Sequence, residues 1–234
     1  MSARQVRLSV VIPTLNEAER VGTCLGDLPH ADVEVVVSDG GSRDGTREVA
    51  ARAGAVVVRG APGRARQMNA GAAVATGRLL AFLHADTIPT IEAWERLAEL
   101  AEFELALWGR FDVRLSGPGM AFRIIERMMN ARSRLTGVAT GDQLIFVSAA
   151  LFREIGGFPE IALMEDVALS VALRRRCPPL CLREHVETSS RKWRREGVVS
   201  TVLLMWSLRF AYALGVEPSI LARRYYGRGT EPRS

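Results

Sequence analysis

Acidic side chains at the ends of apolar runs could bind a cation, accept hydrogen bonds from a nucleoside or remove a proton. The apolar run at residues 79–83 ends abruptly in His84-Ala85-Asp86. Mg²⁺ or Mn²⁺ commonly takes one or two protein carboxylates and leaves its other positions to phosphate oxygens and water, and Mn²⁺ also accepts an imidazole. We therefore predict a divalent cation, Mn²⁺ or Mg²⁺, at Asp86, with His84 and His185 as further candidate ligands. For His84 the alternative is a partly buried histidine bonded to backbone, which we favour over ligation.

A second acidic pair, Glu165-Asp166, follows the apolar residues 161–164 and begins an amphipathic stretch. Partial burial and a like-charged neighbour both raise the pKa of a carboxyl group. A raised pKa suits a general base that takes a proton from a hydroxyl group. The alternative is that the pair only caps the start of a helix.

The loops after the first two apolar runs read PTLNE and SDGGSRDGT, so each carries an acid. Carboxylates such as Glu17 and Asp39 repel phosphates but accept hydrogen bonds from a base N–H or a ribose hydroxyl. Gly41 permits a left-handed turn and the close approach of a ring. These loops therefore predict a nucleoside site, although Asp39 and Asp44 could instead cap the turn and the following helix.

Short apolar runs alternate with helix-like segments through the first half of the chain, which positions these loops. We expect strands at residues 8–12, 33–37, 55–58 and 79–83, and helices at 16–28, 46–53, 64–75 and 92–102. Such alternation is typical of βαβ units and a parallel sheet. Ligands of these α/β sheets bind beyond the carboxyl ends of the strands, so the acidic loops should meet at one rim.

In the second half of the chain, the regular alternation of strands and helices is lost. We expect strands at residues 111–115 and 143–147, helices at 117–135, 151–155 and 166–176, and an apolar segment at 198–216. This segment is long enough to cross a hydrocarbon core of about 30 Å, but Arg209 near its centre opposes insertion by about 2.5–3.5 kcal/mol. Basic clusters flank it. Two alternatives stay open: a helix at the membrane interface, or a helix packed on the core or on a dimer partner.

Composition narrows the class of protein. The 234 residues are 48% hydrophobic and 24% charged, which is typical of a globular chain. The net charge of +5 favours anionic partners, but aromatic content of 6% without a recognition helix argues against nucleic acid. The three cysteines form no CxxC pair, so neither a disulfide framework nor a zinc site is expected. Without a signal-peptide pattern, we expect a cytoplasmic location.

Common phosphate-binding and nucleophile motifs are absent. Lys192 is the only lysine and lies outside any Walker A loop, and no G-x-G-x-x-G follows the first expected strand. The pattern around Ser42 has Asp where the nucleophile elbow G-x-S-x-G needs its last glycine. P-loop, dinucleotide-binding and serine-hydrolase classes are therefore excluded.

Six segments, in this order and spacing, resemble family-two inverting glycosyltransferases with the GT-A fold. They are SVVIPTLNE, VVVSDGGSRDGT, GRARQMNAGAAVATG, LLAFLHADT, TGDQLIFV and MEDVALSVAL. The resemblance runs from about residue 8 to about residue 193. FLHADT and GDQLIF are most similar to a small bacterial subgroup often labelled carotenoid (diaponeurosporenoate-type) glycosyltransferases.

The resemblance implies a nucleotide-sugar donor, most often a UDP-sugar, and an acceptor that it does not identify. The implied donor-binding residues are Pro13, Leu15, Glu17, Asp39, Gly41, Arg64, Gln67, Asn69, Ala85 and Asp86. The implied residues around the acceptor and donor sugar are Gly141, Asp142, Gln143 and Trp193. Asp166 matches the catalytic base, supported by Glu165. His84 departs from the family's D-x-D signature, because it stands where the first Asp is usual.

The resulting expectation is a single inverting sugar transfer to a hydroxyl, carboxyl or phosphate acceptor, which could be a lipid or isoprenoid. Alternatives are a sugar nucleotidyltransferase, which usually carries a basic phosphate loop where this chain has PTLNE, and a degenerate nucleotide-sugar-binding protein. We expect a transferase domain at residues 1–195, with a nucleotide-binding half (1–90) and an acceptor half (91–195). Residues 196–234 form a basic helical segment, of which 196–228 could contact the inner face of the membrane or form a homodimer.

Overall fold

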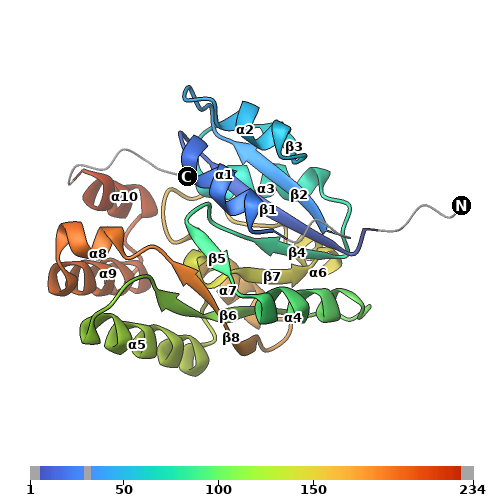
Figure 1. Cartoon of the computed structure of the whole chain (residues 1–234). Coiled ribbons are helices and arrows are strands. Elements are labelled where there is room, and N and C mark those ends of the chain that lie inside the picture. Colours follow the sequence, from blue (N-terminus) through green and yellow to red (C-terminus); the bar gives the residue numbers. More distant parts are fainter. Residues whose placement is uncertain (1–5, 29–32, 228–234) are drawn as a thin grey trace, which may run out of the picture.

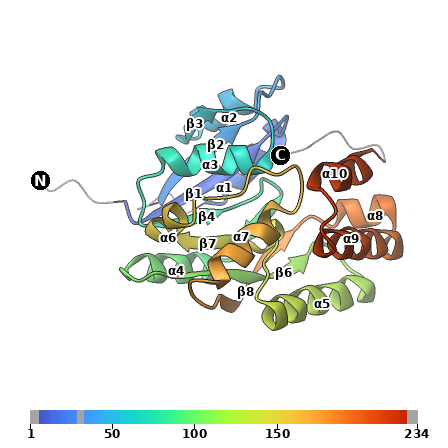
Figure 2. The same ribbon diagram turned by 180° about the vertical axis from the view of Figure 1, so that it is seen from behind.

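A mixed eight-stranded sheet forms the centre of the protein, with helices on both faces (Figures 1 and 2). The computed structural model describes residues 6–28 and 33–227. Residues 1–5 and 228–234, at the two ends of the expected domains, lie outside this range, as does the side chain of Lys192. The strand order is β3-β2-β1-β4-β7-β6-β8-β5.

The first four strands confirm the expected parallel arrangement. They are β1 (Leu8–Thr14), β2 (Val33–Asp39), β3 (Val56–Arg59) and β4 (Leu79–Phe82). β1 pairs in parallel with β2 on one side and with β4 on the other. Pro13 lies inside β1, opposite Ser38, and not in the loop as its position suggested. The pairing of β1 with β4 stops at Val11, so Pro13 has no ladder neighbour on the β4 side, where a missing N–H can be tolerated.

Helices cover the two faces of this sheet because alternate strand residues point in opposite directions. α1 (Ala18–Gly26), α2 (Thr46–Arg52) and α4 (Ile91–Ala101) pack on the face that carries Val10 and Ile12. α3 (Arg64–Val74), α6 (Ala149–Glu154) and α7 (Glu165–Arg174) pack on the face that carries Val11 (Figure 2). The two faces bury separate apolar clusters.

The other half of the sheet is mixed. β7 (Ile145–Ser148) is antiparallel to both β4 and β6 (Trp108–Leu115), whereas β6 is parallel to β8 (Leu180–Thr188). β5 (Thr87–Pro89) pairs antiparallel with β8 at the edge. The sequence did not predict β5 or β8. β8 reads LCLREHVET, whose polar residues break the apolar pattern of a strand.

The chain after the sheet folds back as three helices. These are α8 (Arg191–Glu196), α9 (Val198–Ala213) and α10 (Pro218–Tyr226), grouped at one end of the molecule beside α5 (Met120–Thr136). The expected domain boundary at residue 195 falls inside α8, so no break in the fold separates the two segments. Leu163 and Met164, which precede α7, pack with residues of α9 and α10 in one cluster. Among the described helices, none is long and apolar enough to span a bilayer.

Candidate active site

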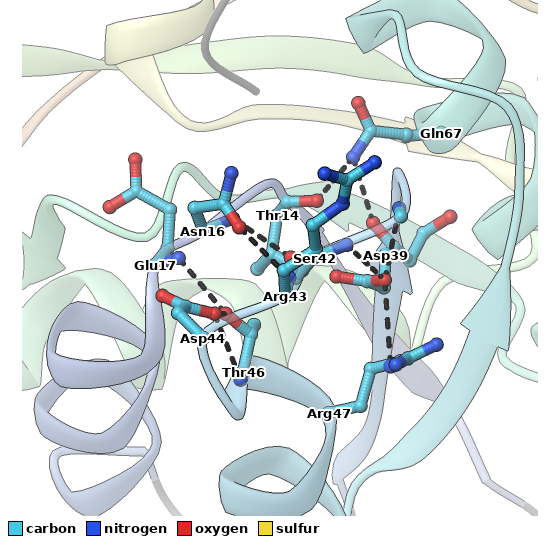
Figure 3. A network of polar contacts seen from close by, with 12 residues as sticks. Thr14, Asn16, Glu17, Asp39, Ser42, Arg43, Asp44, Thr46, Arg47 and Gln67 are labelled. Atoms are coloured by element: carbon cyan, nitrogen blue, oxygen red, sulfur yellow. Dashed lines mark hydrogen bonds and ion pairs between the residues drawn. The ribbon is translucent and has the colours of Figure 1, made fainter.

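Hydrogen bonds join the loop after β1 to the loop after β2 (Figure 3). The Asn16 N–H donates to Ser42 Oγ at 2.8 Å, and the Arg43 N–H donates to Asn16 Oδ1 at 2.9 Å. The Glu17 N–H donates to Thr46 Oγ1 at 2.9 Å. Asn16 adopts a left-handed conformation with φ of 54°, which delays the start of α1 to Ala18. The two loops therefore form one rigid unit at the carboxyl ends of β1 and β2.

Asp39 is completely buried in this unit, and its two oxygens have different surroundings. Oδ2 accepts hydrogen bonds from the N–H groups of Gly41 at 3.0 Å and Ser42 at 2.9 Å, with Arg47 Nε 3.8 Å away (Figure 3). Oδ1 is buried without a hydrogen-bond partner. A buried acceptor is seldom left unsatisfied. One oxygen thus caps the turn, as the alternative interpretation held, and the other can accept from a ligand.

Two other acids in these loops, Asp44 and Glu17, bind groups of the protein itself. Asp44 accepts from the N–H groups of Ala18 and Thr46, both at 3.1 Å, so it caps two helix starts. Glu17 is buried and pairs with Arg20, with a shortest N–O distance of 2.6 Å. Asp44 and Glu17 therefore hold the loops through contacts within the protein.

Two side-chain amides on α3, which the sequence predicted to bind the donor, form hydrogen bonds with backbone groups. Gln67 is fully buried, and its Nε2 donates to the carbonyls of Thr14 at 2.6 Å and Ser38 at 3.1 Å (Figure 3). Asn69 donates to the Phe158 carbonyl at 2.8 Å and accepts from the Phe158 N–H at 2.9 Å. Both amides therefore fasten α3 to neighbouring segments.

Asp86 follows β4 and is exposed, with Ala85 half-buried beside it. The Thr87 N–H donates to the His84 carbonyl at 3.0 Å, which closes the turn. The His84 ring lies against Gly141, where a Cβ atom would approach His84 Cε1 to 2.5 Å. Burial, and secondarily Arg64, lowers the pKa of His84 to about 4, although Asp86 and Asp142 oppose the shift. His84 is therefore neutral at neutral pH, despite two nearby acids.

Asp86 and His84 could bind a cation only if a bound substrate or water supplied its remaining ligands. Within residues 6–28 and 33–227, no cluster of three or more His, Cys, Asp or Glu side chains could hold a metal ion. An exposed carboxylate and a neighbouring neutral imidazole suit an ion that takes its other oxygens from a diphosphate and water. His185 lies on β8 and belongs to no such cluster among the described residues. The register pairs Thr87 with Thr188, and the His185 carbonyl instead accepts from the Thr90 N–H at 3.3 Å.

Asp166 lies in the first turn of α7, after Met164 in a left-handed conformation with φ of 71°. Its Oδ2 accepts from the Gly141 N–H at 3.0 Å, and its Oδ1 accepts from the Val167 N–H at 2.7 Å. Burial and then the neighbouring Glu165 raise the pKa of Asp166 to about 6, against the opposing effect of these hydrogen bonds and Arg64. A carboxylate with a pKa near neutrality can remove a proton efficiently.

The turn that holds Asp166 belongs to a short 3₁₀ segment, Gly141–Gln143. Gln143 is buried and accepts from the Thr140 N–H at 3.1 Å, so it caps this segment. Asp142 is partly buried and its Oδ1 has no hydrogen-bond partner. Burial raises the pKa of Asp142, opposed by Thr140 and Arg132. A cavity of about 10 Å³, enough for one water, adjoins His84 and Asp166.

Arg64, the first residue of α3, brings a positively charged side chain close to Glu165 and Asp166 of α7. Nη1 of Arg64 lies 3.8 Å from Oε1 of Glu165, and Nε of Arg64 is buried without a partner. Burial acts to lower the pKa of Arg64, but Tyr226, Glu165 and Tyr225 raise it. Tyr225 and Tyr226 belong to α10, so this helix lies close to Arg64 and the acids of α7. The sequence interpretation missed them because the RRYY segment was assigned to a basic, membrane-facing tail.

Trp193, which the resemblance placed near the acceptor and donor sugar, lies in an apolar cluster instead. It packs with Leu115, Phe122 and Ile125 in an apolar cluster formed by β6, α5 and α8. Tyr212 of α9 lies in the cluster around Met164, and its pKa is raised by burial and then by Asp166. Of the predicted site residues, Arg64, His84, Asp142, Glu165 and Asp166 lie near one another, with Gly141 bonded to Asp166 and Asp86 close enough to His84 to influence its charge.

Comparison with known sequences identifies relatives that match part of the chain. Glycosyltransferase AglE of Haloferax volcanii is 34% identical over 101 residues, which cover 38% of this chain and 33% of AglE. An uncharacterized glycosyltransferase of Mycobacterium tuberculosis is 41% identical over 80 residues, which cover 34% of this chain and 36% of that protein. The matched segments thus span about a third of the length of these relatives.

Solved structures match more of the chain. The mannosyltransferase PcManGT of Pyrobaculum calidifontis superposes with a TM-score of 0.62 at 18% identity, covering 98% of this chain and 66% of that one. Glucosyl-3-phosphoglycerate synthase of M. tuberculosis gives a TM-score of 0.54 at 20% identity, covering 78% and 70%. These likenesses confirm the expected GT-A fold. The family model described as Glycosyl transferase family 2 matches residues 9–152, well over half of the chain, so the protein belongs to that family.

Proposed function

We propose that this protein is an inverting glycosyltransferase that moves a sugar from a nucleotide-sugar, with a UDP-sugar expected, to an acceptor hydroxyl, carboxyl or phosphate group. The observation that carries the proposal is the environment of Asp166. Its pKa of about 6, its bond to the Gly141 N–H and its position beside His84 support the role of a general base. A residue that only capped α7 would need no raised pKa.

The transfer itself follows from this placement. Asp166 accepts the proton of an acceptor hydroxyl while that oxygen attacks the anomeric carbon opposite the departing nucleoside diphosphate. The two backbone N–H groups fix both carboxylate oxygens, which reduces the reorganisation needed before proton transfer. Glu165 helps to keep the pKa of Asp166 high. Inversion occurs in one displacement, so no covalent nucleophile is required.

The donor would occupy the carboxyl ends of β1, β2 and β4. Oδ1 of Asp39 is the free acceptor for a base N–H. Asp86, with His84 beside it, would hold Mn²⁺ or Mg²⁺, whose charge stabilises a leaving diphosphate when the ion is bound. Arg64 adds a fixed positive charge next to Glu165 on the same side.

Solved neighbours support this donor and this cation. PcManGT is described in complex with GDP-Man and Mn²⁺, and the synthase of M. tuberculosis with Mn²⁺ and UDP. TarS of S. aureus, with a TM-score of 0.58 at 18% identity, is described in complex with UDP-GlcNAc. None of these is described as acting on a carotenoid, so the acceptor is proposed only as a chemical class.

Titration calorimetry with UDP-, GDP- and TDP-sugars, in the presence of Mn²⁺ or Mg²⁺, tests the donor site. We expect one nucleotide to bind in a cation-dependent manner, and Asp166→Ala to retain that binding while losing transfer. Near-normal turnover in Asp166→Ala would remove the base from its role. Cation-dependent binding without hydrolysis of the donor or transfer to any acceptor would indicate the degenerate binding protein. Release of pyrophosphate from a nucleoside triphosphate and a sugar phosphate would indicate a nucleotidyltransferase.

The exposed face of α9 supports contact with an anionic membrane surface at the cytoplasmic face. Five large apolar side chains at spacings of three or four residues are 64–71% exposed: Val199, Leu203, Trp206, Phe210 and Leu214. The opposite face packs inward through Thr201, Leu204 and Leu208. Exposed arginines flank the stripe on α8 and α10. Apolar area next to basic residues is the pattern of an interfacial helix.

Sedimentation with vesicles of phosphatidylglycerol or phosphatidylcholine tests this contact. We expect binding to the anionic vesicles, loss of binding in Trp206→Glu, and no loss in Leu105→Glu, a matched change at a side chain 67% exposed on another surface. Equal binding of all three proteins would refute the membrane role of α9. Concentration-dependent dimers that Trp206→Glu dissociates would instead assign the stripe to a homodimer.

A further inference from the structure

α5 carries an arginine, Arg132, whose charge has no partner among the described residues. Its Nε and Nη2 are buried and make no hydrogen bond to any part of the chain that the structure describes. Of the other three arginines of this helix, two are paired and the third, Arg127, is exposed. Arg123 donates to the Leu115 carbonyl at 2.7 Å, and Nη2 of Arg134 lies 2.7 Å from Asp112. The side chain of Arg132 is therefore exceptional within its own helix.

The surroundings of Arg132 belong to the catalytic rim. Asp142 and Asp166 are the acids that attract its charge, and Arg110 is the cation that repels it. Burial outweighs this attraction and lowers the pKa of Arg132. Arg110 pairs with Asp112 on its own strand, β6, and shares that carboxylate with Arg134. Neither acid forms an ion pair with Arg132, although each lies close enough to influence it.

Asp142 is unsatisfied in the same region, because its Oδ1 is buried without a hydrogen-bond partner. Two charged groups on different elements, α5 and the Gly141–Gln143 segment, are thus desolvated without contacting each other. A buried charge without a partner is costly. Proteins commonly tolerate such a cost where function requires it. The missing partner is therefore expected to come from a ligand.

The position of Arg132 distinguishes the acceptor from the donor. Arg64, on α3 of the nucleotide-binding half, approaches the α7 acids through Glu165, and Arg132 approaches Asp166 from α5 of the other half. We propose that Arg132 binds a carboxylate or phosphate group of the acceptor and so selects anionic acceptors, with Asp142 accepting a hydrogen bond from a neighbouring hydroxyl. This inference rests on the proposed transferase function. Arg132 would be a specificity-determining residue.

Anion binding to the nucleotide-loaded protein tests the proposal directly. Inorganic phosphate is titrated, at constant ionic strength, into protein saturated with UDP and Mn²⁺, so that the donor's phosphate positions are filled. We expect wild type to bind phosphate, Arg132→Gln to bind it at least tenfold more weakly, and Arg127→Gln to match wild type. Arg127 is an exposed arginine of the same helix and is the matched control. Malonate replaces phosphate in a parallel titration to distinguish the two anion classes.

Unchanged phosphate affinity in Arg132→Gln would overturn the proposal. So would an Arg132→Gln protein that loses UDP affinity instead, because that would assign the arginine to the donor. Failure of UDP to bind at all would count against the proposed function. In that case phosphate is titrated without UDP, and the same comparison of Arg132→Gln with Arg127→Gln decides about Arg132.

A stability measurement separates ligand binding from a structural role. Without added anion, we expect Arg132→Met to melt at the same temperature as wild type or higher, because the change removes an unpaired buried charge. Arg123→Met should melt lower, because it removes the ion pair to Glu126 at 2.8 Å and the bond to the Leu115 carbonyl. A fall in melting temperature for Arg132→Met as large as that for Arg123→Met would make Arg132 structural and refute the proposal.

Discussion

Replacing Asp166 with Asn should stabilise the protein while it removes activity. The pKa of Asp166 is raised from 3.8 to about 6, so the native state holds its proton more tightly than the unfolded state. The ionised carboxylate therefore costs stability. This cost is absent below pH 3.8, grows as pH rises, and is complete above about pH 6. At about 1.4 kcal/mol for each pKa unit, the full cost is about 3 kcal/mol.

Asparagine removes this cost but has only one acceptor oxygen. It can therefore keep one of the two bonds from the Gly141 and Val167 N–H groups, and losing the other costs about 1 kcal/mol. The net expectation near pH 7.5 is a gain of about 2 kcal/mol in the free energy of unfolding. Near pH 4.5 most wild-type Asp166 is protonated in the native state, so the remaining cost of about 1 kcal/mol only balances the lost bond.

Urea unfolding followed by circular dichroism at the two pH values measures this difference. Asp44→Asn is the matched control, because hydrogen bonds from Thr46 and Ala18 lower the pKa of Asp44 although burial acts to raise it. Asp44→Asn should therefore destabilise the protein near pH 7.5. Transfer by Asp166→Asn should fall by a factor of about 10² to 10⁴, as for loss of a general base. A pH-independent gain, or a loss of stability at pH 7.5, would refute the account of Asp166.

Three further changes test the remaining contacts. Glu165→Gln should lower the pKa of Asp166, because Glu165 helps to raise it. The acidic limb of the pH–rate profile for kcat/KM should then move to lower pH, and an unmoved limb would contradict this. Asp39→Asn should weaken UDP binding about tenfold, because one lost hydrogen bond costs about 1.4 kcal/mol. Calorimetry measures this change, and an unchanged affinity would count against a contact between Asp39 and the base. Gly141→Ala should lower the melting temperature measured by calorimetry, because its Cβ atom would meet His84 Cε1 at 2.5 Å; an unchanged melting temperature would show that the ring can move away.

The nucleotide-binding half could be predicted from sequence because each strand there is a continuous apolar run. Residues 8–12, 33–37 and 79–83 were assigned correctly, and the parallel topology followed from the helices between them. The position of Asp39 at a strand end was also predictable. Its two oxygens could not be distinguished, because the turn that occupies only Oδ2 depends on the three-dimensional path of the loop.

Polar residues were harder to assign, because residue type does not reveal what a side chain will contact. Gln67 and Asn69 have the chemistry of ligand-binding amides, but folding brings distant carbonyl groups to them first. His185 lies on β8, a strand whose polar sequence concealed both its existence and its register. Arg132 escaped notice for the opposite reason. It is one of many arginines, and only its burial without a partner distinguishes it.

The contact between α10 and Arg64 has a consequence for how the protein is made. Arg64 emerges from the ribosome early, whereas Tyr225 and Tyr226, which lie close enough to influence its charge, emerge more than 150 residues later. A nascent chain that has already formed the nucleotide-binding half would still lack these neighbours. The surroundings of Arg64 are therefore completed only when α10 has been made and has folded back.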